Sequence, residues 1–228
     1  MGANHILAVA CLVTSTASAQ VSFSGLGDLA GGGFLSEVFA LSPTGSLAVG
    51  GSVVAGSGFN QIYDAFVFDA DAGLTPSLLG PAGSARAFAL SADGGAVVGV
   101  VDYGSFSPLG TQAFLWTSQG TTLLGDLPGG VSVVPRSFAR GVSADGSIIV
   151  GIGESTSGNE AWRYHVATST FEPLGDLPGG QFASWAYGVS ADGNTVVGQS
   201  YADANQQAMV WTPQGSMVGL GYLPTLPG

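Results

Sequence analysis

The side chains best suited to chemistry in this sequence are aspartates that recur at a regular spacing. Asp93, Asp145 and Asp192 each lie in the sequence Ser-Ala-Asp-Gly, and a degenerate copy, Ser-Pro-Thr-Gly, ends at Gly45. Carboxylates in such a series could bind calcium or supply the acid and base of a glycosidase. However, one Asp per repeat would be spread around the molecule, and Asp before Gly accepts backbone N–H bonds within its own tight turn. We therefore interpret all three as turn residues and predict no catalytic residue, no metal site and no cofactor.

The other chemically capable residues are explained in the same way. Asp28, Asp126 and Asp176 recur in the motif Leu-Gly-Asp-Leu, again once per repeat. His165 is the only histidine outside the first nineteen residues. A catalytic triad would depend on this one side chain, and a zinc site would need more than one such ligand. We interpret His165 as an ordinary side chain near a turn.

The elements that position these residues form an internal repeat. The turn glycines stand at 45, 94, 146 and 193, so the steps between them are 49, 52 and 47 residues. Each unit of about 48 residues reads as four short strands without helical periodicity, which is the pattern of antiparallel propeller blades. We predict an all-β, β-propeller-like fold of about four blades with four antiparallel strands each. The repeats span approximately 26–77, 78–122, 123–172 and 173–218, with a partial repeat at 219–228.

Two columns of the repeat predict how the strands pack. Small residues precede the turn Ser in each unit, and they suit the crowded strand nearest a propeller axis. We therefore expect the first strand of each unit to lie there. In the second strand a glycine recurs at 50, 99, 151 and 198. A glycine inside a strand usually marks a close approach by another group. We expect that group to be an aromatic ring such as Trp116 or Trp211.

The outer strands outnumber the blades by one, so two segments compete for the same place. Residues 216–223 and residues 21–29 both qualify as the partner of the strand at 208–212. We favour 216–223, because the hairpin is local and its loop-closure cost is small. Residues 21–29 would then lie against the first blade or join a neighbouring chain. The expected state is a monomer, or a weak association through unpaired terminal strands.

The first nineteen residues predict export. The apolar run Ile6–Val13 is followed by Ala17-Ser18-Ala19 before Gln20, the small-x-small pattern of signal peptidase cleavage between Ala19 and Gln20. No Lys or Arg precedes the apolar run, and a lipid-modified Cys11 is the alternative. We interpret 1–19 as a signal peptide and 20–228 as a single repeat domain. The expected location is extracellular or at the cell surface, with the periplasm as the alternative.

Composition excludes several classes of partner. The chain has four Lys and Arg in total against fifteen Asp and Glu, for a net charge of −11. Such a surface repels phosphate backbones and anionic lipid, so we expect no binding to nucleic acid or to membrane surfaces. No apolar run is long enough to span a bilayer, so the mature chain should have no membrane span. Its single Cys lies within residues 1–19, so no disulfide is expected.

Three motifs recur in a fixed order: Gly-Val-Ser-Ala-Asp-Gly-x-x-Val-Val-Gly, then Ala-Phe-x-Trp, then Leu-Gly-Asp-Leu-Pro-Gly-Gly. Together they resemble the HAF family of extracellular repeats over nearly all of residues 21–228. The family's His-Ala-Phe triplet has lost its His here, since Asp64, Gln112, Glu160 and Gln207 precede the four alanines. The resemblance implies a secreted or surface-displayed bacterial protein with a β-propeller fold. It implies no established activity.

The candidate binding residues come from the loops and strand starts on one face of the expected disc. They are Tyr63, Arg86, Tyr103, Phe106, Arg136, Arg140 and Trp185. Aromatic rings beside Arg suit sugar stacking or a protein partner, although the same rings would also cover the base of the loops. We therefore predict an exported, non-enzymatic binding module for an unknown protein or glycan. The alternatives are a carbohydrate-active hydrolase or lyase, and a purely structural segment of a larger adhesin or autotransporter.

Overall fold

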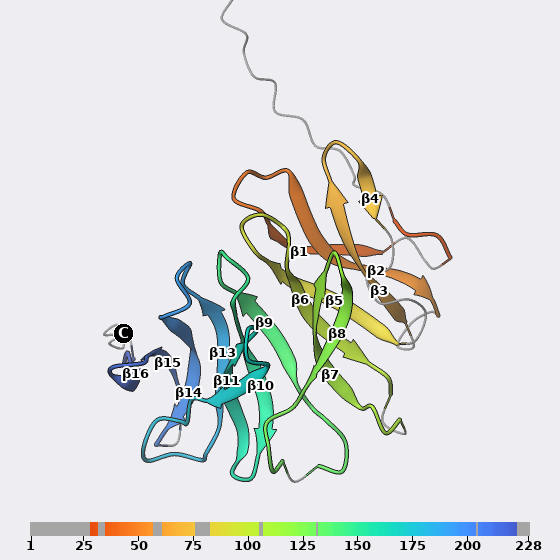
Figure 1. The fold of residues 1–228 in the computed structure, drawn as a ribbon. Helices are drawn as coiled ribbons and strands as arrows, with labels where there is room; N and C mark the ends of the chain where they lie inside the picture. The colour runs from red at the N-terminus through yellow and green to blue at the C-terminus, as the bar shows by residue number, and fades with distance from the viewer. Residues whose placement is uncertain are drawn as a thin grey trace, which may run out of the picture.

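The computed structural model describes residues 28–31, 35–56, 61–75, 83–104, 107–130, 132–203 and 205–222, and they form four antiparallel sheets (Figure 1). Blade 1 consists of β1 (Ser36–Leu41), β2 (Leu47–Ala55), β3 (Ile62–Asp69) and β4 (Gly73–Thr75). Blade 2 consists of β5 (Ser84–Leu90), β6 (Val97–Asp102), β7 (Thr111–Thr117) and β8 (Gly120–Gly125). Blade 3 consists of β9 (Phe138–Val142), β10 (Ile148–Ser155), β11 (Gly158–His165) and β12 (Thr170–Pro173). Blade 4 consists of β13 (Ser184–Val189), β14 (Val196–Ala202), β15 (Asn205–Thr212) and β16 (Ser216–Gly219).

Every blade is a meander in which each strand pairs with the next one along the chain. This confirms the predicted all-β, propeller-like fold of four blades with four antiparallel strands. The first strand of each blade is here called the inner strand. In blades 2 to 4 it packs against the blade before it: β5 against β1–β3, β9 against β5–β7, and β13 against β9–β11. The blades follow one another in an open fan (Figure 1), and within the described strands blades 1 and 4 do not pack together.

The Asp-Gly turns have the predicted local chemistry. The turn glycines have φ between 71° and 75°, a region that only glycine enters without strain. In the turn of blade 3, the carboxylate of Asp145 accepts bonds from the Ser143 hydroxyl and from the Ser147 N–H. Asp93 and Asp192 accept the equivalent bonds in blades 2 and 4. The three aspartates are therefore occupied inside their own turns.

Neighbouring turns are also joined to each other. The N–H of Ala92 donates to the carbonyl of Ala144 at 2.9 Å, and the N–H of Ala144 donates to the carbonyl of Ala191 at 3.0 Å. The donor always belongs to the earlier blade. Blade 1 has Pro43 at this position, which has no N–H and so cannot donate to blade 2.

Each inner strand contains a β-bulge at the same place in the repeat. The residue without a partner in the ladder lies three positions before the turn Ser, and the four such residues are Phe39, Phe88, Arg140 and Tyr187. A bulge bends its strand and turns a side chain away from the regular alternation. Here it directs one large side chain per blade away from the regular alternation, while in blades 2 to 4 the preceding alanine stays buried in the interface with the blade before.

The bulges also explain the glycines of the second strand. A Cβ on Gly151 would lie 2.0 Å from the Phe138 carbonyl oxygen, and the other three glycines of the column meet the equivalent carbonyl at 1.8 to 2.0 Å. The predicted approach of an aromatic ring is confirmed at two of these glycines, but Trp116 and Trp211, the rings named for it, are not among the nearest atoms at any of the four. The rings that do approach are Phe66 at Gly50 and Trp162 at Gly151, and each directly follows the Ala of the Ala-aromatic motif, two residues before the position that Trp116 and Trp211 occupy in it.

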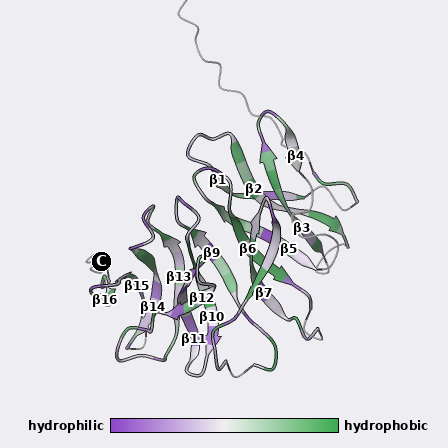
Figure 2. Ribbon diagram, in the orientation of Figure 1, coloured by the Kyte–Doolittle hydropathy of each residue, from purple (hydrophilic) through white to green (hydrophobic). Residues whose placement is uncertain are grey.

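The hydrophobic core lies between the blades. Val49 and Ala65 of blade 1 face Ala87 and Phe114 of blade 2, and two further clusters fill the next two interfaces in the same way. The hydrophobic residues accordingly follow the strands (Figure 2). At the C-terminal end β16 pairs with β15, Thr212 opposite Ser216, which confirms the favoured outer strand. The competing segment, 21–29, lies almost wholly outside the described residues.

Candidate functional site

The bulged side chains of the four inner strands lie next to one another along the fan. The rings of Phe39 and Phe88 meet edge to face with their centroids 5.1 Å apart. The guanidinium carbon of Arg140 lies 4.4 Å from the centroid of Phe88. Arg140 and Tyr187 are close enough for each charge to influence the pKa of the other group. One bulge per blade thus builds a continuous row of aromatic and basic groups.

A pocket of about 280 Å³ opens beside this row, between blades 3 and 4. Its lining residues are Arg136, Phe138, Arg140, Ile152, Asn159, Trp185 and Tyr187. Three of the predicted binding residues, Arg136, Arg140 and Trp185, are therefore brought together. The sequence reasoning missed Phe138 and Tyr187. Both lie two residues from a predicted one, so strand alternation was the signal that would have found them.

Two arginines line this pocket without an acidic partner. Among the described residues no carboxylate lies within ion-pair distance of Arg136 or Arg140, and none lines the pocket. Burial lowers the pKa of Arg140, and its buried Nε has no hydrogen-bond acceptor. Burial also raises the pKa of the Tyr187 hydroxyl, with an opposing effect from Arg140. A half-buried, unpaired cation attracts an anion more strongly than an exposed one, because water screens it less.

The other two arginines have partners. Arg163 is buried, lies 3.3 Å from Glu172 and stacks over Trp211. His165 shares the same Glu172 carboxylate at 2.9 Å, so it belongs to a local ion-pair group of blade 3. Among the described residues, Arg136 and Arg140 are therefore the cations that are available to a ligand.

The remaining predicted binding residues form a separate group in blades 1 and 2. The guanidinium of Arg86 lies 3.6 Å above the ring of Tyr63 and 3.9 Å from Glu37. Tyr63 is buried, and Tyr103 packs at the edge of the core between these two blades. Tyr63, Arg86 and Tyr103 therefore do not line the arginine pocket. Phe106 lies outside the described residues, as do the signal peptide 1–19 and the cleavage residues Ala19 and Gln20.

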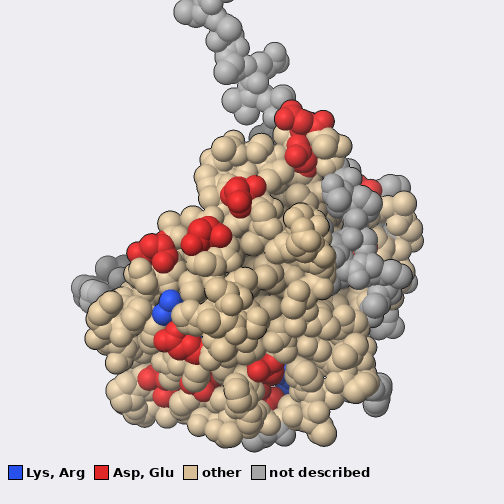
Figure 3. Space-filling view, in the orientation of Figure 1, with Lys and Arg blue, Asp and Glu red and all other residues tan. Residues whose placement is uncertain are grey.

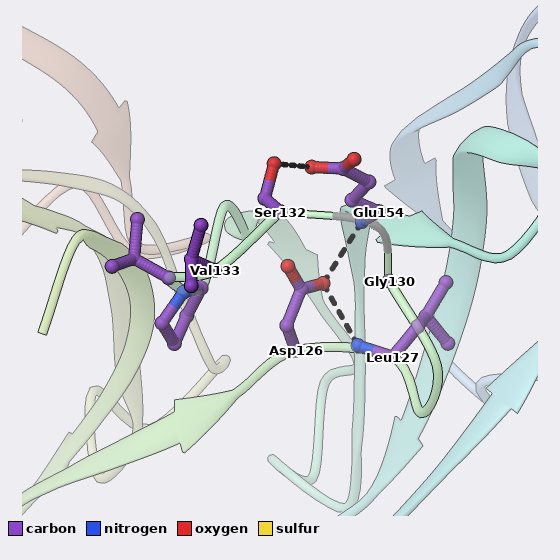
Figure 4. A pocket seen from close by; sticks show the side chains of 8 residues that line it. Asp126, Leu127, Gly130, Ser132, Val133 and Glu154 are labelled. Atoms are coloured by element: carbon purple, nitrogen blue, oxygen red, sulfur yellow. Dashed lines mark hydrogen bonds between the residues drawn. The ribbon is translucent and has the colours of Figure 1, made fainter. Parts of the chain in front are cut away.

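A second hollow, of about 200 Å³, is lined by two carboxylates (Figure 4). Asp126 accepts bonds from the N–H groups of Leu127 and Glu154 on one oxygen and from the Arg136 N–H on the other. Burial raises its pKa despite these bonds. The Glu154 carboxylate accepts the Ser132 hydroxyl. Because both Asp126 oxygens hold backbone donors, this carboxylate closes the 126–136 loop and is not free for acid–base chemistry.

Within the described ranges, no three His, Cys, Asp or Glu side chains are grouped so as to hold a metal ion. The same ranges contain no helix that is long and apolar enough to cross a membrane. Acidic side chains lie in separate groups over the face seen in Figure 3, and few basic atoms are visible there. The arginine pocket is thus a basic spot on an acidic molecule.

The fold and the pocket define the class: an open array of antiparallel propeller blades with an arginine–aromatic pocket. No family model and no curated protein matches the chain. Among solved structures it is similar to a TolB protein from Agrobacterium tumefaciens, with 18% identity and a TM-score of 0.57 over 79% of this chain and 63% of that one. TolB from Acinetobacter baumannii is similar with 13% identity and a TM-score of 0.54, over 81% of this chain and 43% of that one. The chain thus spans less than two thirds of either protein, and at such identities the similarity shows the fold alone.

Proposed function

We propose that the protein is an exported, non-catalytic module that binds a protein or glycan through a carboxylate of the ligand at Arg136 and Arg140. The observation that carries this proposal is the pocket with two arginines and three aromatic rings, in which the described residues supply neither an ion-pair partner nor a carboxylate. In a chain with a net charge of −11, an isolated basic pocket selects anionic groups that the rest of the surface repels.

The pocket chemistry fits a ligand with an acid group next to a flat apolar surface. Guanidinium groups pair with carboxylates through two parallel hydrogen bonds. Trp185, Tyr187 and Phe138 supply faces on which a sugar ring or an apolar side chain can stack. A volume of about 280 Å³ suits one sugar unit or one or two side chains. We place the protein with the HAF repeats, at the cell surface, outside the cell or in the periplasm.

The pocket disfavours the hydrolase alternative. A glycosidase needs two carboxylates on either side of one bond. The described lining of the arginine pocket contains none, and the Asp126 carboxylate is held by its own loop.

The test is a titration of the intrinsic tryptophan fluorescence, because Trp185 lines the pocket. The probes are hexaglutamate and hexagalacturonate, each paired with its uncharged counterpart, hexaglutamine and a neutral galactose hexamer. We expect an acidic probe to bind and its neutral counterpart not to bind. Tighter binding of hexaglutamate would indicate a protein ligand, and tighter binding of hexagalacturonate would indicate a glycan ligand.

The decisive variant is Arg140→Met, which removes the charge and keeps the apolar stem. We expect it to weaken binding of the acidic probe by about tenfold or more. Arg86→Met is the matched control, since it removes one positive charge outside the pocket and should leave the affinity nearly unchanged. Equal losses in both variants, or equal binding of acidic and neutral probes, would contradict the proposed site.

A further inference from the structure

The inner strand of blade 1 lacks the cover that the other inner strands have. In blades 2 to 4 this strand packs on the preceding blade, and Ala87, Ala139 and Ala186 are fully buried there. In blade 1, five of the six residues of β1 are exposed, and Val38, at the same position as those alanines, is 44% exposed. Leu41, three residues later, is 62% exposed. β1 therefore presents an apolar surface of the kind that is buried elsewhere in the array.

At the opposite end of the fan, blade 4 exposes residues whose equivalents are buried in the other blades. In blades 1 to 3, Val49, Val98 and Val150 are fully buried under the inner strand of the next blade. Val197 is the equivalent residue of blade 4, and it is 45% exposed. Ala208 is exposed as well, although its three equivalents in the Ala-aromatic motif are fully buried. The β14–β15 face thus has the residues that receive an inner strand, and none of the described inner strands of the next position lies on it.

Exposed large apolar side chains are concentrated in these two blades. Blade 1 has Leu35, Val38, Phe39, Leu41 and Ile62, and blade 4 has Tyr187, Val197 and Val218, with Leu220 and Tyr222 just after it. Blades 2 and 3 contribute only Leu109 and Val133 to this set among the described residues, and both lie in loops. Exposed apolar surface that is concentrated in the two terminal blades indicates contact sites there.

The hydrogen bonds between turns all run in the same direction along the array, so the turn of blade 4 is left as a donor and the turn of blade 1 as an acceptor. The earlier blade donates through its turn Ala and the later blade accepts through its turn carbonyl. Ala191 is next in line to donate, and its N–H has no acceptor among the described residues. Pro43 keeps its carbonyl and lacks an N–H, so it can only accept. The Ala191 N–H and the Pro43 carbonyl are therefore suited to form the next bond of this series.

We propose that a second copy of this chain docks head to tail, with its β1 on the β14–β15 face and its Pro43 carbonyl bonded to the Ala191 N–H. This junction repeats the geometry of the three interfaces inside the chain. If both ends of two copies join, they close a ring of eight blades, which is within the usual range for propellers. This inference does not depend on the ligand of the arginine pocket.

Charge limits the strength of this association. Each copy has a net charge of −11, so two copies repel each other over a distance set by the salt concentration. The apolar contact of Val38 and Leu41 with Val197 is not weakened by salt. We therefore expect association to become tighter as NaCl is added, whereas contacts made by ion pairs would become weaker.

The test is sedimentation velocity of the full chain over a wide range of concentration, at low and high NaCl. We expect a concentration-dependent rise in mass above that of the monomer. Val38→Asp and Val197→Asp should each weaken it by about a hundredfold or more, since each would bury an unpaired carboxylate. Leu109→Asp is the matched control, because Leu109 is also 44% exposed but lies in a loop of blade 2.

Mixing the two variants distinguishes a head-to-tail contact from a symmetric one. Val38→Asp chains still have an intact β14–β15 face, and Val197→Asp chains still have an intact β1. We expect an equimolar mixture to form heterodimers through the one intact junction, while each variant alone stays monomeric. Circular dichroism of each variant shows whether it is folded. A wild-type chain that stays monomeric at all concentrations, or a mixture that fails to associate while both variants are folded, would overturn the proposal.

Discussion

At the scale of single residues, the repeated aspartates stabilise turns through bonds to their charged form. The Ser143 hydroxyl, the Ser147 N–H and the Ser147 hydroxyl all donate to Asp145, and these bonds hold its pKa at about 2, against an ordinary value of 3.8. The stabilisation that the charged Asp145 carboxylate contributes to the folded state is therefore complete above about pH 3.8, and it disappears as the pH falls towards 2.

Asp145→Ala should lower the melting temperature by a few degrees at neutral pH, because the turn loses its acceptor. The difference from wild type should shrink as the pH falls from 3.8 towards 2, where the wild-type carboxylate is itself protonated. Thermal unfolding followed by circular dichroism at several pH values measures this difference. A chelator should leave both melting temperatures unchanged. A drop of the wild-type value on chelation would instead assign these carboxylates to a cation.

At the scale of elements, the blades are joined by buried serines that link strands of neighbouring sheets. The Ser137 hydroxyl accepts the N–H of Ala113 in β7 at 3.0 Å and donates to the Gly125 carbonyl at the end of β8. Ser184 makes the same two bonds one blade later, to Ala161 and Gly175. Both serines are fully buried. Each therefore satisfies a backbone N–H and a backbone carbonyl of the preceding blade.

Ser137→Ala should destabilise the protein by about 1–3 kcal/mol, because it leaves the Ala113 N–H and the Gly125 carbonyl unpaired. Ser46→Ala removes an exposed hydroxyl from the turn of blade 1 and should change stability by less than about 0.5 kcal/mol. Urea denaturation of the two variants gives the comparison. Equal stabilities of Ser137→Ala and Ser46→Ala would show that this bond does not hold blades 2 and 3 together.

The blade could be predicted from the sequence, whereas the bulge could not. Ser-Ala-Asp-Gly and the Val-Val-Gly strand are local patterns, and turn chemistry and strand alternation are sufficient to interpret them. The bulge at Arg140 inserts one extra residue into the pairing of β9 with β10. The alternation of inward and outward side chains in a five-residue strand does not reveal such an insertion. The sequence therefore predicts one loop face for Arg140 and Tyr63, whereas the bulge directs Arg140 to Phe88 and Tyr187. The recurring glycine of the second strand is visible in the sequence, but its cause, the close approach of a carbonyl of the bulged strand, follows only from the three-dimensional packing.

At the scale of the whole molecule, the order of blades along the chain predicts where it unfolds first. The blades pack only on their sequence neighbours within the described strands, so stability is close to a sum of blade and interface terms. Blades 2 and 3 have an interface on each side, and blades 1 and 4 have one. The terminal blades should therefore open at a lower free energy than the central ones.

Hydrogen exchange followed by mass spectrometry tests this order. At low protein concentration we expect β9–β11 to exchange last, and β1 and β16 first, because β1 is exposed and β16 is an edge strand paired only with β15. At high concentration the head-to-tail contact should slow exchange in β1 and in β14–β15, while β4 and β8 stay unchanged. Uniform exchange rates in all four blades at low concentration would mean that the array unfolds as one cooperative unit. Slower exchange of β1 without a matching change in β14–β15 would indicate that something other than a second copy covers it.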